Sequence, residues 1–216
     1  MKTTPRLGRQ FDCEKLILVS LVLLACVLVL ATAVQPWIDP RWLYMDTQTV
    51  GELSGDCCHI YDGAMSTLGI KLWAATAAIS VLTSLVCLRR RKFRAAWFAA
   101  HAALVSGVLA LDDAFLLHEV AFPKLGISQT FAIAMIGILI LSYLGVQHAF
   151  VRASYRWLLA LSLAAFAVSV GIDQVFHSIA SIWIVAEDGP KFIGIITWFL
   201  FHLMVYANLI VPKEQV

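Results

Sequence analysis

The sequence predicts an all-α integral membrane protein, a polytopic bundle of six transmembrane helices. Three observations lead to this fold class: the composition, six long apolar segments, and an uneven distribution of basic residues. Of the 216 residues, 61% are hydrophobic and 14% are charged, whereas an average soluble domain is about half apolar and about a quarter charged. The mean hydropathy is +0.83. Such a chain has too little polar surface for a water-soluble enzyme, a nucleic-acid-binding domain or a disordered protein.

Six apolar segments are each long enough to cross a hydrocarbon core of about 30 Å, which takes roughly 20 helical residues. No segment alternates polar and apolar residues with a period of two, so a transmembrane β-barrel is excluded. No internal repeat or Gly/Ser linker divides the chain, which indicates a single domain over residues 1–216, with an outer loop at 35–67. The predicted helices cover approximately residues 16–34, 69–88, 95–117, 125–146, 157–178 and 190–211.

The first segment resembles a signal peptide, because Lys2, Arg6 and Arg9 precede an apolar run. Ala31-Thr32-Ala33 also offers a small-residue cleavage pattern. The apolar region of a secretory signal is usually about 7–15 residues long, and the run from Leu16 to Val34 exceeds this length. The first segment is therefore interpreted as a retained helix, with a cleaved signal as the alternative.

The other five segments contain few polar interruptions. Lys71 lies near the start of the second, where its long side chain can reach the interface. The third is apolar until it meets Asp112, the fourth has no charge, and the fifth includes Asp173. Pro190 follows Gly189 and indicates the start of the last helix, because proline is favoured at the first helical position. Its apolar run from Phe192 to Val211 is interrupted only by His202.

The basic residues predict that both termini are cytoplasmic, because cytoplasmic connections carry an excess of Lys and Arg. The chain is accordingly expected in the cytoplasmic (inner) membrane, in contact with the lipid bilayer and not with nucleic acid. Of the 16 basic residues, 12 lie in the two terminal tails and in two alternate connections, at 89–94 and 152–156.

Ionisable residues near the end of the third helix form the first part of a candidate site. Charges within spanning helices are costly and commonly mark functional sites. At about 100° per residue, Asp112 and Glu119 share one face of the helix. Asp113 and His118 are expected to point elsewhere, unless the helix unwinds locally.

The fifth and sixth helices contribute the second part. Asp173 and His177 lie one turn apart on the fifth helix, so both can reach one ion or one water. Asp112 and Asp173 lie about 26 and about 24 Å along their helices, near the outer boundary of the membrane. Glu187 enters at the same level, from the connection before the last helix.

This convergence predicts a metal site with Asp112, Glu119, Asp173 and His177 as ligands. Glu187 and Asp112 are the candidate catalytic residues, with Glu187 as a ligand or general base. Oxygen ligands with a few imidazoles suit a divalent metal such as zinc, manganese or iron. Such a site would serve a metal-dependent enzyme that acts at the outer face on a lipid or another membrane-partitioned substrate.

Three alternatives remain open. The carboxylates and imidazoles can form a purely structural network at the interface. They can also form part of a proton or cation channel or carrier, with His101 and His202 continuing the polar path. In the third alternative, the chain is a non-catalytic subunit of a membrane complex.

Cys57-Cys58-His59 lies in the outer loop. Neighbouring cysteines rarely form an unstrained disulfide. A soft metal such as copper would suit these side chains, and a reactive pair without function is the alternative.

The second half of the chain resembles a group of uncharacterised bacterial six-helix membrane proteins, over roughly residues 95–205. This resemblance implies no activity. The motifs on which it depends are Leu111-Asp112-Asp113, Leu117-His118-Glu119, Glu187-Asp188-Gly189 and Lys191-Phe192-Ile193-Gly194.

A remoter resemblance is to the alkaline-ceramidase-like membrane metal hydrolases, which hold zinc with three His and use a Ser and an Asp. It implies comparable parts for Asp112 and His177. Those enzymes place two His one turn apart in the last helix, whereas here Tyr206 follows His202 at that spacing.

Overall fold

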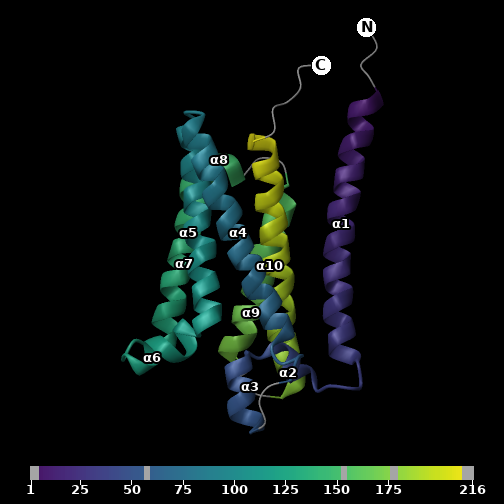
Figure 1. Cartoon of the computed structure of the whole chain (residues 1–216), viewed down its shortest axis with the longest axis vertical. Coiled ribbons are helices and arrows are strands. Elements are labelled where there is room, and N and C mark those ends of the chain that lie inside the picture. The colour runs from purple at the N-terminus through teal and green to yellow at the C-terminus, as the bar shows by residue number, and fades with distance from the viewer. Residues whose placement is uncertain (1–4, 56–58, 152–154, 176–179, 211–216) are drawn as a thin grey trace.

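The structure is a computed structural model that describes residues 5–55, 59–151, 155–175 and 180–210, with side chains from Cys13 onward. Within these ranges the chain is helical and contains no strand, and its long helices run along one common direction (Figure 1). The helices are α1 (Pro5–Val34), α2 (Pro40–Tyr44), α3 (Thr47–Ser54), α4 (Ala64–Arg89), α5 (Phe93–Phe115), a π-helical turn η1 (Leu117–Ala121), α6 (Phe122–Lys124), α7 (Gln129–Val146), α8 (His148–Val151), α9 (Arg156–Val175) and α10 (Ser181–Ile210).

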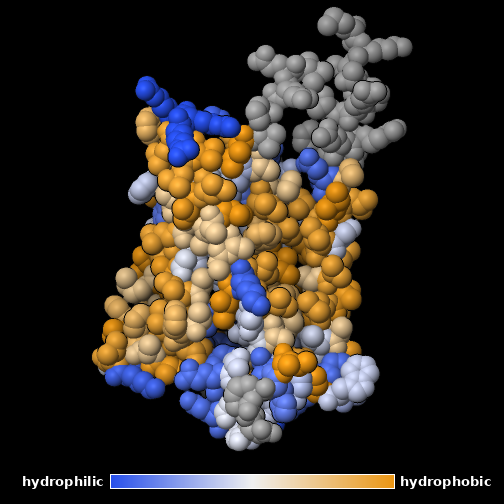
Figure 2. All heavy atoms as spheres, viewed as in Figure 1, coloured by the Kyte–Doolittle hydropathy of each residue, from blue (hydrophilic) through white to orange (hydrophobic). Residues whose placement is uncertain are grey.

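Six of the described helices are long and apolar enough to cross a membrane: α1, α4, α5, α7, α9 and α10. The predicted all-helical class with six spans is therefore confirmed, and the protein is a multi-pass membrane protein that contacts lipid. Figure 2 shows hydrophobic residues over the middle of the visible face, with hydrophilic residues gathered mainly towards the two ends. The start of α1 and the end of α10 lie at the same end of the bundle, as an even number of spans requires (Figure 1).

The last helix differs from its predicted bounds. It begins at Ser181 rather than at residue 190, and Pro190 lies inside it. Proline removes one backbone hydrogen bond from a helix interior, and transmembrane helices tolerate this loss where neighbouring groups satisfy the freed carbonyl. As a consequence, Glu187 and Asp188 are helical residues one turn before Lys191, and not loop residues.

The predicted outer loop at 35–67 also contains more structure than expected, since it forms α2 and α3 and its end begins α4. An aspartate caps each short helix. The side chain of Asp39 accepts a hydrogen bond from the backbone N–H of Arg41 (3.1 Å), and that of Asp46 accepts one from Thr49 (2.9 Å). Aspartate is a favoured N-cap because its carboxylate satisfies these otherwise free donors.

Helix α10 is at the centre of the bundle and packs against α9, α4, α1 and α2, while α4 and α5 form a closely packed pair. The core between these helices is rich in aromatic rings. Its largest fully buried members are Trp73, Phe98, Tyr143, Trp198 and Phe201.

The contact between α9 and α10 depends on a glycine. The Ser162 hydroxyl of α9 donates to the Gly194 carbonyl oxygen at 2.8 Å. A Cβ atom at Gly194 would lie 2.6 Å from Cε1 of Phe166. The two helices can approach this closely only because residue 194 has no side chain.

We expect Gly194→Ala to lower the free energy of unfolding by about 1–3 kcal/mol, because the added methyl group forces Phe166 to move in a packed core. Denaturation of the purified protein in detergent, followed by circular dichroism, measures the change. Gly137→Ala on α7 is the matched control, since a Cβ there meets nothing within 4 Å. Equal stability of the two variants would show that the α9–α10 contact is looser than described.

Candidate functional site

Helix α5 ends in a local unwinding that brings His118 to Asp112. Leu116 adopts the left-handed conformation (φ 48°, ψ 46°), and the π-helical turn η1 follows it. One carboxylate oxygen of Asp112 accepts a hydrogen bond from the backbone N–H of His118 at 3.0 Å, and the other lies 2.6 Å from its Nδ1. In a continuous helix, six residues at about 100° each would place these side chains far apart around the axis. The sequence predicted that His118 points away from Asp112 unless the helix unwinds locally. The helix does unwind here, and the two side chains meet.

The carboxylate sets the state of the imidazole. Burial by itself lowers the pKa of His118, but the hydrogen bond and the negative charge of Asp112, together with the charge of Glu119, outweigh this effect and raise the pKa above its ordinary value. With Nδ1–H directed at Asp112, a neutral ring presents Nε2 as an acceptor. Nε2 lies 3.5 Å from an oxygen of Glu119.

Asp113 also belongs to the site, through Lys191 of α10. The Lys191 ammonium lies 2.9 Å from one oxygen of Asp113, and the indole N–H of Trp73 donates to the other oxygen at 3.0 Å. The sequence predicted that Asp113 points away from the face shared by Asp112 and Glu119. Asp113 still faces the interior of the bundle, because α4 and α10 pack against its side of α5.

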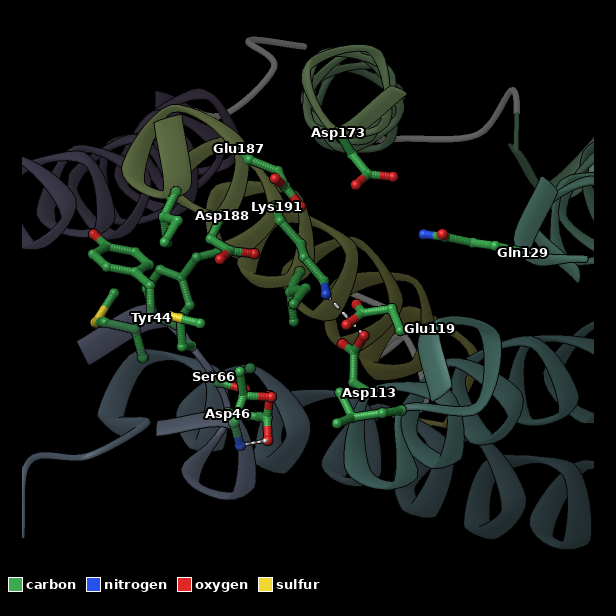
Figure 3. Close-up of a pocket in the computed structure, with 18 residues that line it drawn as sticks. Tyr44, Asp46, Ser66, Asp113, Glu119, Gln129, Asp173, Glu187, Asp188 and Lys191 are labelled. Carbon is green, nitrogen blue, oxygen red and sulfur yellow. Dashed lines mark hydrogen bonds and ion pairs between the residues drawn. The ribbon is translucent and has the colours of Figure 1, made fainter. Parts of the chain in front are cut away.

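A cavity of about 340 Å³ opens at the end of the bundle formed by α3, η1 and the start of α10. Lys191 is the only basic residue among its described lining residues, and it reaches into the cavity from α10 (Figure 3). Figure 3 shows carboxylates directed at this space from several elements, with Asp173 on α9 opposite Asp113 on α5. The acidic lining residues are Asp46, Asp113, Glu119, Asp173, Glu187 and Asp188.

A second cavity of about 130 Å³ adjoins the first and lies between α5, α7 and α9. The two share five lining residues, so the acidic space continues into a mainly apolar one. Asp112 and His118 line only the second cavity. The shared residues are Asp113, Glu119, Asp173, Glu187 and Lys191.

The predicted site residues are therefore partly brought together. Glu119, Asp173 and Glu187 line the same cavity, whereas Asp112 lies beside it and uses both carboxylate oxygens to hold His118. His177 lies outside the described residues. Among those that the structure describes, no group of three or more His, Cys, Asp or Glu side chains is close enough to hold a metal ion.

Sequence reasoning missed Asp46 and Asp188, which also line the cavity. Asp46 is remote in sequence, but its position before α3 carries an N-cap signal that could have located the helix. His202 is buried and hydrogen-bonded to the Tyr143 hydroxyl (2.8 Å) and to the Trp198 carbonyl oxygen (2.8 Å), and neither cavity includes it or His101. Cys57 and Cys58 lie outside the described residues.

Comparison with known proteins identifies a family for almost the whole chain. The model of a family described as "Domain of unknown function (DUF8692)" matches residues 20–205. The chain belongs to this family. The match extends well beyond the predicted resemblance over 95–205, because it also includes most of α1 and the connection that follows it. No curated protein and no solved structure matches the chain, and the resemblance to alkaline ceramidases has no support from these comparisons.

The Asp113–Lys191 pair yields a stability prediction. We expect Lys191→Met to destabilise the protein by about 1–3 kcal/mol, because Asp113 then loses its cationic partner. The loss is smaller than for a fully enclosed ion pair, because water screens the partly exposed ammonium group. The double variant Asp113→Asn/Lys191→Met should regain most of this loss. Denaturant unfolding of the wild type, the two single variants and the double variant measures the coupling. Simple addition of the two single effects would show that the pair does not interact.

The Asp112–His118 pair yields a pH prediction. Because the folded pKa of His118 lies above the unfolded value of about 6.5, the pair contributes stability fully below that value, and the contribution is lost as the pH rises through the folded pKa. The stability difference between wild type and His118→Gln should therefore be largest in mildly acidic solution and shrink as the pH rises. Unfolding measured across this range tests it. His148→Gln is the control, since His148 is exposed and bonds the Gly145 carbonyl oxygen. If the free energy of unfolding of His118→Gln differed from that of the wild type by the same amount at every pH, the prediction would be wrong.

Proposed function

We propose that this membrane protein binds a cation in the acidic cavity at the outer membrane face. The observation that supports the proposal is the charge of the cavity wall: six carboxylate side chains surround the space, and one lysine, already paired with Asp113, opposes them. The side chain of Glu119 is 47% exposed, and partial desolvation at this wall raises its pKa above the ordinary value. A bound cation would neutralise part of this excess.

The outer location follows from the basic residues. The connection between α4 and α5, where basic side chains are concentrated, lies at the same end of the bundle as the start of α1 and the end of α10 (Figure 1). The cavity lies at the other end. If the basic end is cytoplasmic, as the positive-inside rule indicates, the cavity faces the outside of a cytoplasmic (inner) membrane.

The size and spacing of the acidic groups favour an organic ammonium ion over a single metal. The carboxylates are distributed around about 340 Å³, a volume in the range of small-molecule sites. A divalent metal needs ligands at about 2.0–2.2 Å, and the described residues show no group of three close enough.

A divalent metal is the second candidate, and the Asp112–His118 pair is the observation that favours it. Zinc, manganese or iron would be held by Glu119 and Asp173 together with His177, which lies outside the described residues, and would supply an activated water. His118, oriented by Asp112, would be the adjacent base. This arrangement corresponds to a metal-dependent enzyme that acts on a lipid or another membrane-partitioned substrate.

Binding measured on the purified protein in detergent tests the proposal with two kinds of probe, butylamine as the ammonium ion and Mn²⁺ or Zn²⁺ as the metal. We expect butylamine to bind, and Asp173→Asn and Glu187→Gln each to weaken its binding by about tenfold through loss of one carboxylate. Glu52→Gln on α3 removes the same charge from an exposed residue outside the cavity lining and serves as the control.

The outcomes separate the candidates. Stoichiometric metal in the purified protein, lost in Asp173→Asn and retained in Glu52→Gln, would assign the site to a metal instead of an ammonium ion. Failure of both probes to bind, or equal binding by all three variants, would overturn the proposal that the cavity is a cation site.

A further inference from the structure

The second cavity has a polarity gradient along its length. It lies mainly between the membrane-spanning helices α5, α7 and α9, and on each of these a polar residue near the end of the bundle is followed by apolar residues at greater depth. On α9, Asp173 lies near the end of the helix, and Val170 and Phe166 lie deeper in the bundle. On α5, Asp113 lies near the end of the helix and Leu109 lies deeper. A ligand that fits this lining has a polar head at the membrane boundary and an apolar body inside the bilayer.

Helix α7 provides the apolar wall of this cavity. Gln129 lines the acidic cavity at the start of the helix, and Ile133, Ile136 and Ile140 line the second cavity at increasing depth. Ile140 is eleven residues beyond Gln129, which corresponds to about 16 Å along the helix axis. The two adjoining cavities therefore extend from the membrane boundary well into the hydrocarbon region.

The second cavity is accessible from the lipid. Val170 lines it and is 43% exposed, on a helix that spans the membrane. Helix α7 packs chiefly against α5 and α9 chiefly against α10, so the cavity lies between two helix pairs. A molecule dissolved in the bilayer can enter between α7 and α9 without passing through water.

The head of such a molecule would meet the Asp112–His118 pair. Asp112 is 4% exposed and holds Nδ1 of His118 at 2.6 Å, and Nε2 of the same ring lies 3.5 Å from an oxygen of Glu119. Glu119 and Asp173 line the same junction, and Lys191 is already paired with Asp113. Carboxylates outnumber basic side chains in this lining, and such an excess of negative charge complements a head that is positively charged and donates hydrogen bonds, as a protonated amine does.

We propose that the two cavities together bind an amine-headed amphiphile, with its ammonium group beside Glu119 and Asp173 and its hydrocarbon tail along Ile133, Ile136 and Ile140. This inference rests on the proposed cation site and names its ligand class. It assigns the recognition of the tail to the second cavity and the route of entry to the gap between α7 and α9.

The test measures the binding of tritiated dodecylamine to the purified protein at one fixed detergent concentration, so that partitioning of the amine into micelles is the same for every variant. Ile136→Trp adds bulk to the apolar wall of the second cavity and leaves every polar lining residue in place. Ile138→Trp makes the same change on the lipid-facing side of α7, where Ile138 is 59% exposed, and is the matched control. Ile133→Trp fills the same cavity at another depth, in case Ile136→Trp does not fold.

We expect the wild type and Ile138→Trp to bind dodecylamine alike and Ile136→Trp to bind it at least about tenfold more weakly, with butylamine binding unchanged within about twofold. Dodecanoate, which has the same tail and an anionic head, should not compete. If Ile136→Trp or Ile133→Trp folds and binds dodecylamine as tightly as Ile138→Trp does, the assignment of the tail to the second cavity is overturned. The proposed cation site is not affected by that result. Competition by dodecanoate as strong as that by dodecylamine would overturn the cation site itself, because the head charge would then not be recognised.

Discussion

The salt bridge between Lys191 and Asp113 is the interaction on which the arrangement of the site depends. An ammonium group within a spanning helix is stable only with a partner or in contact with water, and Lys191 has both, since it pairs with Asp113 at 2.9 Å and reaches into the cavity (Figure 3). The pair joins α10 to α5, and Trp73 extends it to α4 through a hydrogen bond to the same carboxylate. It therefore fixes the rotation of α10, which directs Glu187 and Asp188 of the preceding turn into the cavity.

Two local departures from regular helix structure complete this end of the bundle. Helix α10 begins at Ser181 and continues through Pro190, where its start was predicted, and α5 unwinds at Leu116, where the predicted helix extended to residue 117. The left-handed conformation of a leucine costs about 1–2 kcal/mol, and the two hydrogen bonds that Asp112 accepts from His118 offset this cost. Both departures bring polar side chains into the interior of the bundle, where they can meet a ligand or each other.

The two adjoining cavities match the environment in which the protein lies. In a bilayer the boundary between headgroups and acyl chains imposes a steep change of polarity over a short distance. The lining changes from carboxylates to isoleucines over the same direction, and α7 packs chiefly against α5 while α9 packs chiefly against α10. A site with this gradient is suited to a ligand that resides at the same boundary. The Asp112–His118 pair lies where the two parts meet.

The sequence by itself determined the membrane class, the six spans and the level of the polar groups, because a hydrocarbon solvent demands long apolar helices whatever their neighbours are. It also placed Asp112, Asp173 and Glu187 at one level, because the distance along each helix sets the depth of a residue. Only the tertiary structure decided which carboxylates share a cavity. Asp113 faces Lys191, and Asp112 is occupied by His118, because the rotation of each helix and the unwinding at Leu116 depend on contacts between residues far apart in the chain. No periodicity within a single helix contains that information.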